Sequence, residues 1–173
     1  MKTVLPFLVF ALLFSACNPK SGTSSVAASE ESTPQTEEEL ADRMITKVRR
    51  IVDATDERLF TATPVIDTLP VEQGMSSGRI LKIWIENEQA VKLTVTEPDD
   101  SGNMSGLSTF YFAGSDLFYA SQPFAHFIFI GGNLEYWADE TWQVNPVSAN
   151  ILDAREGYLY EEANKYLRWF FGN

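Results

Sequence analysis

The side chains in this chain that could do chemistry are one histidine, one cysteine and several adjacent carboxylates. His126 precedes Phe127 in an expected strand. A catalytic triad or a metal site would need a nucleophile or a second ligand beside it, and the sequence places none there. HExxH, phosphate-loop and dinucleotide motifs are also missing from the sequence. We therefore interpret His126 as a half-exposed packing residue.

Adjacent carboxylates are the second candidate for chemistry. The pairs are Asp139 with Glu140, Glu161 with Glu162, and Asp99 with Asp100. Two carboxylates held at a fixed separation in a cleft can hydrolyse glycosidic bonds, which makes a carboxylate-dependent glycan hydrolase one hypothesis. It requires a concave pocket and raised pKa values. The pairs fall in expected turns and on the polar face of an expected helix, which favours solvated charges.

The segment 98–103 resembles a calcium loop in its oxygen-bearing side chains, which are Asp99, Asp100, Ser101 and Asn103. A calcium loop also needs a glycine after its third ligand and a glutamate at its twelfth position. Here Gly102 precedes Asn103, and the twelfth position is Phe110. The segment is predicted to be a turn, and we expect no metal and no cofactor.

Cys17 follows a short basic start and an apolar run over residues 3–14. That run is shorter than the roughly 20 residues of a membrane-spanning helix and suits a signal peptide. Ser15-Ala16-Cys17 resembles the lipobox of bacterial lipoproteins, with Phe14 where leucine is usual. The resemblance implies that residues 1–16 are a signal peptide and that Cys17 carries acyl chains that anchor the protein to a membrane. The alternative is an ordinary secretory signal followed by a chance cysteine.

The remaining sequence predicts a tether and one domain. Residues 17–35 are rich in Ser, Thr, Ala, Pro and Glu, which predicts a lipidated flexible tether, and residues 36–173 have the length of a single domain. The chain has 173 residues and a formal net charge of −11. This charge argues against nucleic acid, or anionic lipid headgroups, as partners of a basic patch. A single cysteine allows no internal disulfide.

Helical periodicity appears at both ends of the domain. Thr36 and Glu39 form an expected capping box, followed by an apolar stripe and a helix end near Asp53. The members of that stripe are Leu40, Met44, Val48, Ile51 and Val52. A second helix is predicted over 150–171 and should pack on the Phe/Leu/Tyr face of a sheet. Its stripe contains Leu152, Leu159, Ala163, Tyr166 and Phe170.

Between the helices the period changes to two. Residues 80–86 and 90–97 predict a hairpin around Asn87-Glu88-Gln89. Residues 110–119 align without gaps onto 127–136, and each copy reads as strand, glycine turn, strand. The hairpins predict four cross-strand pairs on one core face: Phe112 with Leu117, Phe110 with Tyr119, Phe129 with Leu134, and Phe127 with Tyr136. Trp142 and Val144 could add a further strand.

These elements predict an α+β fold, an antiparallel β-meander sheet flanked by an N-terminal and a C-terminal helix. The repeated pattern of aromatic, x, Phe, x, Gly, x, polar, Leu resembles β-hairpin domains of small uncharacterised bacterial secreted proteins and lipoproteins, over roughly residues 79–171. The resemblance implies a fold and transfers no activity to any residue.

The second face of the predicted sheet is unusually aromatic. It carries Trp84, Tyr111, Phe118, Ile128 and Trp137. Either the N-terminal helix covers this face, or it is an exposed patch that binds a partner.

The sequence leaves three functions open. The first is a non-enzymatic binding or interaction module for a protein or glycan partner, held at the bacterial envelope by its lipid anchor. The second is the glycan hydrolase described above, and the third is a structural lipoprotein of envelope assembly. The expected location is the outer membrane, and the residues after Cys17 lack an acidic cluster, which favours its periplasmic face.

Overall fold

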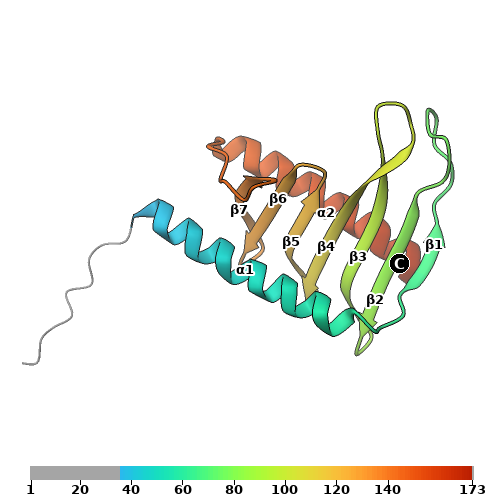
Figure 1. Cartoon of the computed structure of the whole chain (residues 1–173), viewed down its shortest axis with the longest axis horizontal. Helices are drawn as coiled ribbons and strands as arrows, with labels where there is room; N and C mark the ends of the chain where they lie inside the picture. Colours follow the sequence, from blue (N-terminus) through green and yellow to red (C-terminus); the bar gives the residue numbers. More distant parts are fainter. Residues whose placement is uncertain (1–35, 173) are drawn as a thin grey trace, which may run out of the picture. The chain divides into compact units, whose positions relative to one another are not determined.

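The computed structural model describes residues 36–172, which form two helices and one seven-stranded sheet (Figure 1). In chain order the elements are α1 (Glu37–Leu59), β1 (Val65–Thr68), β2 (Ile80–Glu86), β3 (Gln89–Pro98), β4 (Met104–Ala113), β5 (Asp116–Gln122), β6 (Ala125–Ile130), β7 (Asn133–Asp139) and α2 (Ala149–Phe171). Every strand pairs antiparallel with its sequence neighbour, in the order β1 to β7. The predicted α+β meander with a helix at each end is confirmed.

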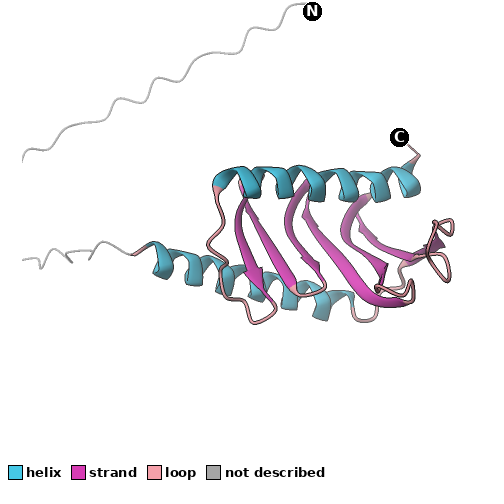
Figure 2. Ribbon diagram, turned by 90° about the horizontal axis from the view of Figure 1, so that it is seen from above, coloured by secondary structure: helices cyan, strands magenta, loops and turns pink. Residues whose placement is uncertain are grey.

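The two helices lie on opposite faces of the sheet (Figure 2). The larger buried cluster joins the sheet to α2 through Leu159, Ala163 and Tyr166. A smaller cluster joins the other face to α1 through Ile45 and Val48. The domain therefore has three layers, and the sheet is hydrophobic on both sides.

The helix α1 begins as its capping box predicts. The Thr36 backbone N–H donates to the Glu39 carboxylate at 3.0 Å, and the Glu39 N–H donates to the Thr36 hydroxyl at 3.2 Å. The helix runs beyond the expected end near Asp53, to Leu59. The predicted stripe is wrong in part, because Leu40 and Ile51 are 43% and 42% exposed. The residues buried against the sheet side of the helix are Ala41, Ile45, Val48, Thr55 and Leu59.

Helix α2 confirms the second predicted helix and its packing. Leu159, Ala163 and Tyr166 are buried, and Leu152 and Phe170 pack partly buried against the same cluster. Gly172 ends the helix with φ of 72°, a left-handed conformation that glycine adopts at low cost.

The hairpins turn tightly, as predicted. Asn87 and Glu88 both have positive φ, 50° and 65°, and they connect β2 to β3 as a two-residue turn. Gly131 and Gly132 do the same between β6 and β7, with φ of 60° and 91°. Two consecutive positive φ angles are the geometry whose twist matches that of the flanking strands.

The register shifts by a β-bulge in four of the six strand pairs, and two of these shifts change the expected pairing. Phe112 faces Leu117 and Phe129 faces Leu134, as predicted. Beyond them the register shifts by one residue, so Tyr111 faces Tyr119 and Ile128 faces Tyr136. The predicted pairs of Phe110 with Tyr119 and of Phe127 with Tyr136 are therefore wrong. The extra residue turns the tyrosines to the opposite face of the sheet.

The face covered by α1 carries two cross-strand rows. The row beneath the helix is largely aromatic and consists of Trp84, Lys92, Tyr111, Tyr119, Ile128 and Tyr136. The next row along the strands consists of Lys82, Thr94, Thr109, Ser121, His126 and Ala138. The helix packs on the aromatic row, while the second row is mostly small and polar, and its Thr94, Thr109 and Ala138 are buried.

Candidate functional site

A groove of about 810 Å³ lies between the first half of α1 and the segment that follows β7. The helix contributes Glu37, Glu38, Ala41, Asp42, Ile45, Thr46 and Arg49, and the opposite wall contains Tyr136, Trp142, Val144 and Pro146, among others. The helix wall thus carries most of the charges, and the opposite wall combines aromatic and apolar side chains with polar ones such as Gln143 and Asn145. Concave sites that combine an apolar lining with a few polar groups are typical of ligand binding.

Trp142 in the groove wall has a strained backbone. Its φ of 69° lies in the left-handed region, which a bulky side chain seldom adopts. The Asp139 carboxylate holds this turn by accepting hydrogen bonds from the backbone N–H groups of Thr141 and Gln143, at 2.8 and 3.0 Å. The Trp142 N–H donates to the Asp139 carbonyl oxygen at 2.9 Å. The surrounding bonds therefore impose a conformation that glycine would adopt more easily.

The indole of Trp142 lies on an aromatic stack. Its ring centroid is 3.9 Å from that of His126, and the planes differ by 9°. The Tyr119 ring is stacked 5.7 Å from the indole, and the Tyr119 hydroxyl lies 2.7 Å from His126 Nδ1. The Arg49 guanidinium of α1 is 5.0 Å from the Trp142 ring centroid, within cation–π range. The stack thus connects the groove wall to the sheet and to α1.

Burial decides the protonation of this stack. It lowers the pKa of His126, and the positive charge of Arg49 acts in the same direction. Burial also raises the pKa of Tyr119 to about 12. Near pH 7 both side chains are therefore neutral. The Tyr119 hydroxyl and His126 Nδ1 share one hydrogen bond, in which the imidazole tautomer sets the donor.

Carboxylates line the helix side of the groove. Glu37 and Glu38 stand in the first turn of α1, where negative charge suits the helix dipole, and Asp42 follows one turn later. Glu135 lies on the opposite wall. The arrangement places an apolar aromatic surface beside acceptor oxygens. It is suited to holding a ligand that has both apolar and donor or cationic groups.

The five residues predicted to share one aromatic face are divided by the structure. Tyr111 and Ile128 are 3% and 0% exposed, and Ile128 belongs to the buried cluster beneath α1. Trp84 is half-buried on the same face, where the Lys92 ammonium lies 5.3 Å from its ring centroid. Phe118 is half-buried at the edge of that cluster.

Trp137 lies on the opposite face from the other four. It pairs with Phe127, packs against the α2 cluster and has the Arg155 guanidinium 4.9 Å from its ring centroid. The bulge after the turn at Gly131-Gly132 accounts for this, because it reverses the face of every residue beyond it in β7. The predicted aromatic face is therefore partly covered by α1, and Trp137 packs in the other layer while it also contributes to the lining of the groove.

Asp56 fastens the C-terminal half of α1 to this face. Its carboxylate accepts hydrogen bonds from the Tyr111 hydroxyl at 2.8 and 2.9 Å and from the Lys92 ammonium at 2.7 Å. Burial, and then this hydrogen bond, raise the pKa of Tyr111. These contacts tie the helix to β3 and β4.

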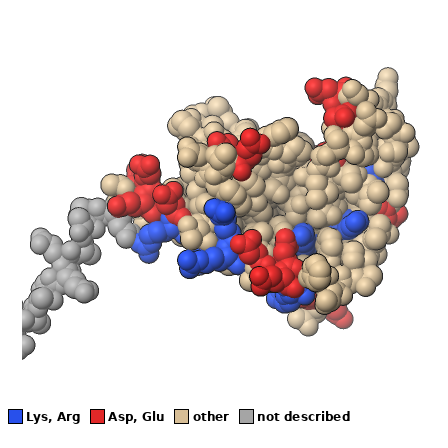
Figure 3. Space-filling model, viewed as in Figure 1, with Lys and Arg blue, Asp and Glu red and all other residues tan. Residues whose placement is uncertain are grey.

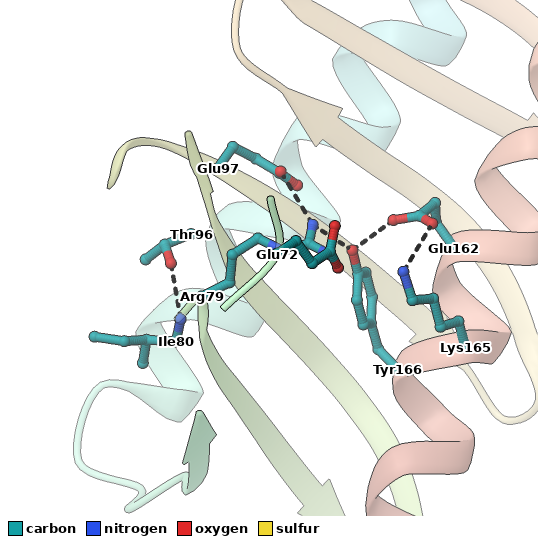
Figure 4. A network of polar contacts seen from close by, with 8 residues as sticks. All are labelled: Glu72, Arg79, Ile80, Thr96, Glu97, Glu162, Lys165 and Tyr166. Atoms are coloured by element: carbon teal, nitrogen blue, oxygen red, sulfur yellow. Dashed lines mark hydrogen bonds and ion pairs between the residues drawn. The ribbon is translucent and has the colours of Figure 1, made fainter. Parts of the chain in front are cut away.

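A second polar network lies at the other end of the sheet, between α2 and the strands (Figure 4). The Arg79 guanidinium donates to the Tyr166 hydroxyl at 2.9 Å and pairs with Glu97 and Glu72 at 3.3 and 3.4 Å. The Tyr166 hydroxyl in turn donates to Glu162. Burial raises the pKa of Tyr166. The network links α2 to β3 and to the segment before β2, which is a structural role.

The carboxylate pairs considered for hydrolysis have local partners. Asp139 holds the Trp142 turn, and Glu162 accepts from Tyr166. Asp99 accepts from the backbone N–H groups of Ser101 and Asn103, both at 2.9 Å, which confirms the predicted turn. Among residues 36–172, no three His, Cys, Asp or Glu side chains come together as a metal site.

Two groove residues that sequence reasoning missed are Trp142 and Arg49. Trp142 was expected to extend a strand, but in the described part of the chain only a single bridge, between Ala138 and Val144, forms there. The spacing of Asp139 and Thr141 is a turn signal that could have indicated the loop. Nothing in the sequence places Arg49 beside the indole, because the two are distant along the chain.

Cys17 lies outside the described residues, as do the predicted signal peptide and tether. Neither described helix is long and apolar enough to cross a membrane. Comparison with family models, with curated proteins and with solved structures gives no match to this chain.

Proposed function

We propose that this protein is a lipoprotein of the bacterial envelope, anchored through Cys17, and that its domain is a non-enzymatic binding module. Its ligand site is the groove between α1 and the segment 141–147. The observation that carries this proposal is the strained backbone of Trp142 in the groove wall. Strain at an exposed turn is typical of ligand-binding positions, since folding alone would favour glycine there.

The lining of the groove favours a protein partner over a glycan. The indole face that lies on His126 is not open to a sugar ring, which leaves less aromatic surface for stacking. Val144 is 41% exposed beside β7, the last strand of the sheet, and could accept an extended segment. Glu37, Glu38 and Asp42 on the other wall would pair with basic side chains of that segment.

Site-specific photocrosslinking tests the proposal. A photoreactive residue replaces Val144 in the groove or, as the matched control, exposed Tyr158 on α2, in cells that make the lipidated protein. We expect an adduct of defined mass from position 144 only, and its loss when Trp142→Ala is added. Equal adducts from both positions, or none from position 144, would contradict a groove ligand. An adduct that contains sugar would assign a glycan instead.

The anchor has its own test. Mass spectrometry of the mature protein should find Cys17 as its first residue with acyl chains attached. Cys17→Ser should abolish the acylation and the detergent-phase partitioning. A mature chain that begins elsewhere, or an unmodified cysteine, would contradict the anchor without affecting the groove.

A further inference from the structure

The outward face of α1 combines apolar and basic side chains. Leu40 and Ile51, which the sequence predicts to be buried, are 43% and 42% exposed. The sheet is contacted through Ile45 and Val48, and Leu40 and Ile51 lie at the edge of that contacting face, on the side of the helix that carries Lys47. The helix therefore keeps a second apolar stripe that no described element covers.

Lys and Arg side chains gather on the same side of α1. Exposed Arg43, Lys47, Arg50 and Arg58 border a shallow depression with Thr46, Ile51, Ala54 and Thr55, and its lining includes no Asp or Glu. In the space-filling view, the basic side chains lie along this helix with acidic groups flanking them (Figure 3). Arg58 at the far end pairs with Glu86 at 3.2 Å. The positive band consists of Arg43, Lys47, Arg50 and Arg58.

We propose that this band docks on anionic lipid headgroups of the membrane that holds the anchor, a proposal that rests on the function proposed above. A helix with apolar and basic side chains on one face is typical of binding at the membrane interface. The net charge of −11 predicts no such surface. At a contact, however, salt screens charges beyond about 8 Å, so the carboxylates on the rest of the domain contribute little there.

The position of α1 in the chain also favours a membrane as the occupant. The helix begins at Glu37, and the segment 18–35 separates it from Cys17. A chain of about 18 residues spans at most ~60 Å, so an anchored domain stays close enough for repeated contact with the surface.

A second copy of this chain fits the band less well. Pairing two such faces would place Arg43, Lys47 and Arg50 of one copy close to the same cations of the other, and like charges in contact disfavour association. An acidic protein partner would neutralise the basic side chains of the band, but the anchored domain lies closer to the bilayer than to any such partner. The experiment below separates these occupants.

Vesicle binding tests the proposal on the chain from residue 17 onward with Cys17→Ser, which contains the complete core and lacks any lipid. Circular dichroism verifies that each variant folds. Sedimentation is measured with vesicles of phosphatidylcholine alone and with added phosphatidylglycerol, in low and high salt. We expect binding to the anionic vesicles only, and its loss in high salt.

Charge reversal identifies the face. Each basic residue near an anionic surface contributes about fivefold in affinity, so Lys47→Glu with Arg50→Glu should weaken binding by more than about tenfold. The matched control, Lys165→Glu with Arg168→Glu on α2, changes the net charge equally and should retain binding.

A probe on the helix gives a second readout. A polarity-sensitive dye at Thr46→Cys should shift to the blue on anionic vesicles, whereas one at Glu161→Cys should not. Absence of binding to anionic vesicles, or equal loss in both charge-reversal pairs, would overturn the docking face. Self-association or binding to an acidic protein in place of vesicles would also overturn it. None of these outcomes depends on whether Cys17 is acylated, so failure of the anchor remains distinguishable.

Discussion

The indole of Trp142 lies flat on the imidazole of His126, with ring centroids 3.9 Å apart and planes 9° apart. This contact, together with the Asp139 turn, holds a bulky residue at φ of 69°. It joins the wall of the groove to the sheet. Both the strain and the stack can be measured separately by substitution.

At position 142 a glycine variant should be more stable than an alanine variant, which reverses the usual order of stability. Both substitutions remove the ring, but only glycine relieves the left-handed backbone, which costs other residues about 1–2 kcal/mol. We expect Trp142→Gly to unfold at a denaturant midpoint corresponding to about 1 kcal/mol more stability than Trp142→Ala. Val144 lies outside the left-handed region, so Val144→Ala should be more stable than Val144→Gly. An alanine variant at least as stable as the glycine variant would show that the turn is unstrained.

The stability of the domain should fall as the pH drops below about 6.5, the unperturbed pKa of histidine. Burial lowers the pKa of His126 in the folded state, so the unfolded chain takes up its proton first. As the pH falls from the pKa of His126 in the unfolded chain to its lower pKa in the folded domain, stability is lost. The stability that neutral His126 contributes is fully present above about pH 6.5.

Urea unfolding of the wild type and of His126→Gln at pH 7.5 and 5.5 measures this effect. Only the wild type should lose stability through protonation of His126. The lowered pKa values of Asp99 and Asp139 act at lower pH and in both proteins. An identical pH dependence of the two proteins would contradict the assignment.

Asp56 should be a principal attachment of α1 to the sheet. Tyr111→Phe removes one hydrogen bond and should lower the free energy of unfolding by about 1 kcal/mol. Asp56→Ala leaves both the Tyr111 hydroxyl and the Lys92 ammonium without this acceptor and should cost about 2 kcal/mol. The double variant should cost less than the sum of the two. Strict additivity would mean that the contact contributes nothing.

Removing the charge of Arg79 should lower the stability of the domain more than removing any other charge between α2 and the sheet. Its side chain is 7% exposed and bonded to Tyr166, Glu97 and Glu72. Arg79→Met leaves these partners without their cation and should lower the free energy of unfolding by about 3 kcal/mol. Exposed Arg168→Met is the control and should change it by less than about 0.5 kcal/mol. Comparable losses in the two variants would mean that the network does not fasten α2.

A glycine substitution in the turn between β2 and β3 should stabilise the domain. Glu88 has φ of 65° in a two-residue turn that favours Asn followed by Gly. Glu88→Gly should therefore raise the free energy of unfolding by about 1 kcal/mol. Gln89→Gly, one residue later and inside β3, should lower it by about 0.5–1 kcal/mol. Thermal unfolding of the two variants side by side measures the opposite signs.

Local patterns in the sequence determined the elements of this fold. The capping box at Thr36, the glycine turn at Gly131-Gly132 and the repeat that pairs Phe112 with Leu117 involve residues within a few positions of one another. Their geometry depends on backbone propensity and nearby hydrogen bonds. For that reason the sequence alone could predict the meander, its turns and a helix at each end.

Only the tertiary structure decided which face each residue occupies and what lies in the site. A bulge adds one residue without a sequence signal strong enough to locate it. One bulge in β5 moved Tyr119, and another in β7 moved Trp137, to faces other than those predicted. The inward side of α1 depended on which of two apolar stripes the sheet could accommodate. The groove joins Arg49 to Trp142 across much of the chain, and only packing of the helix on the sheet brings such distant side chains together.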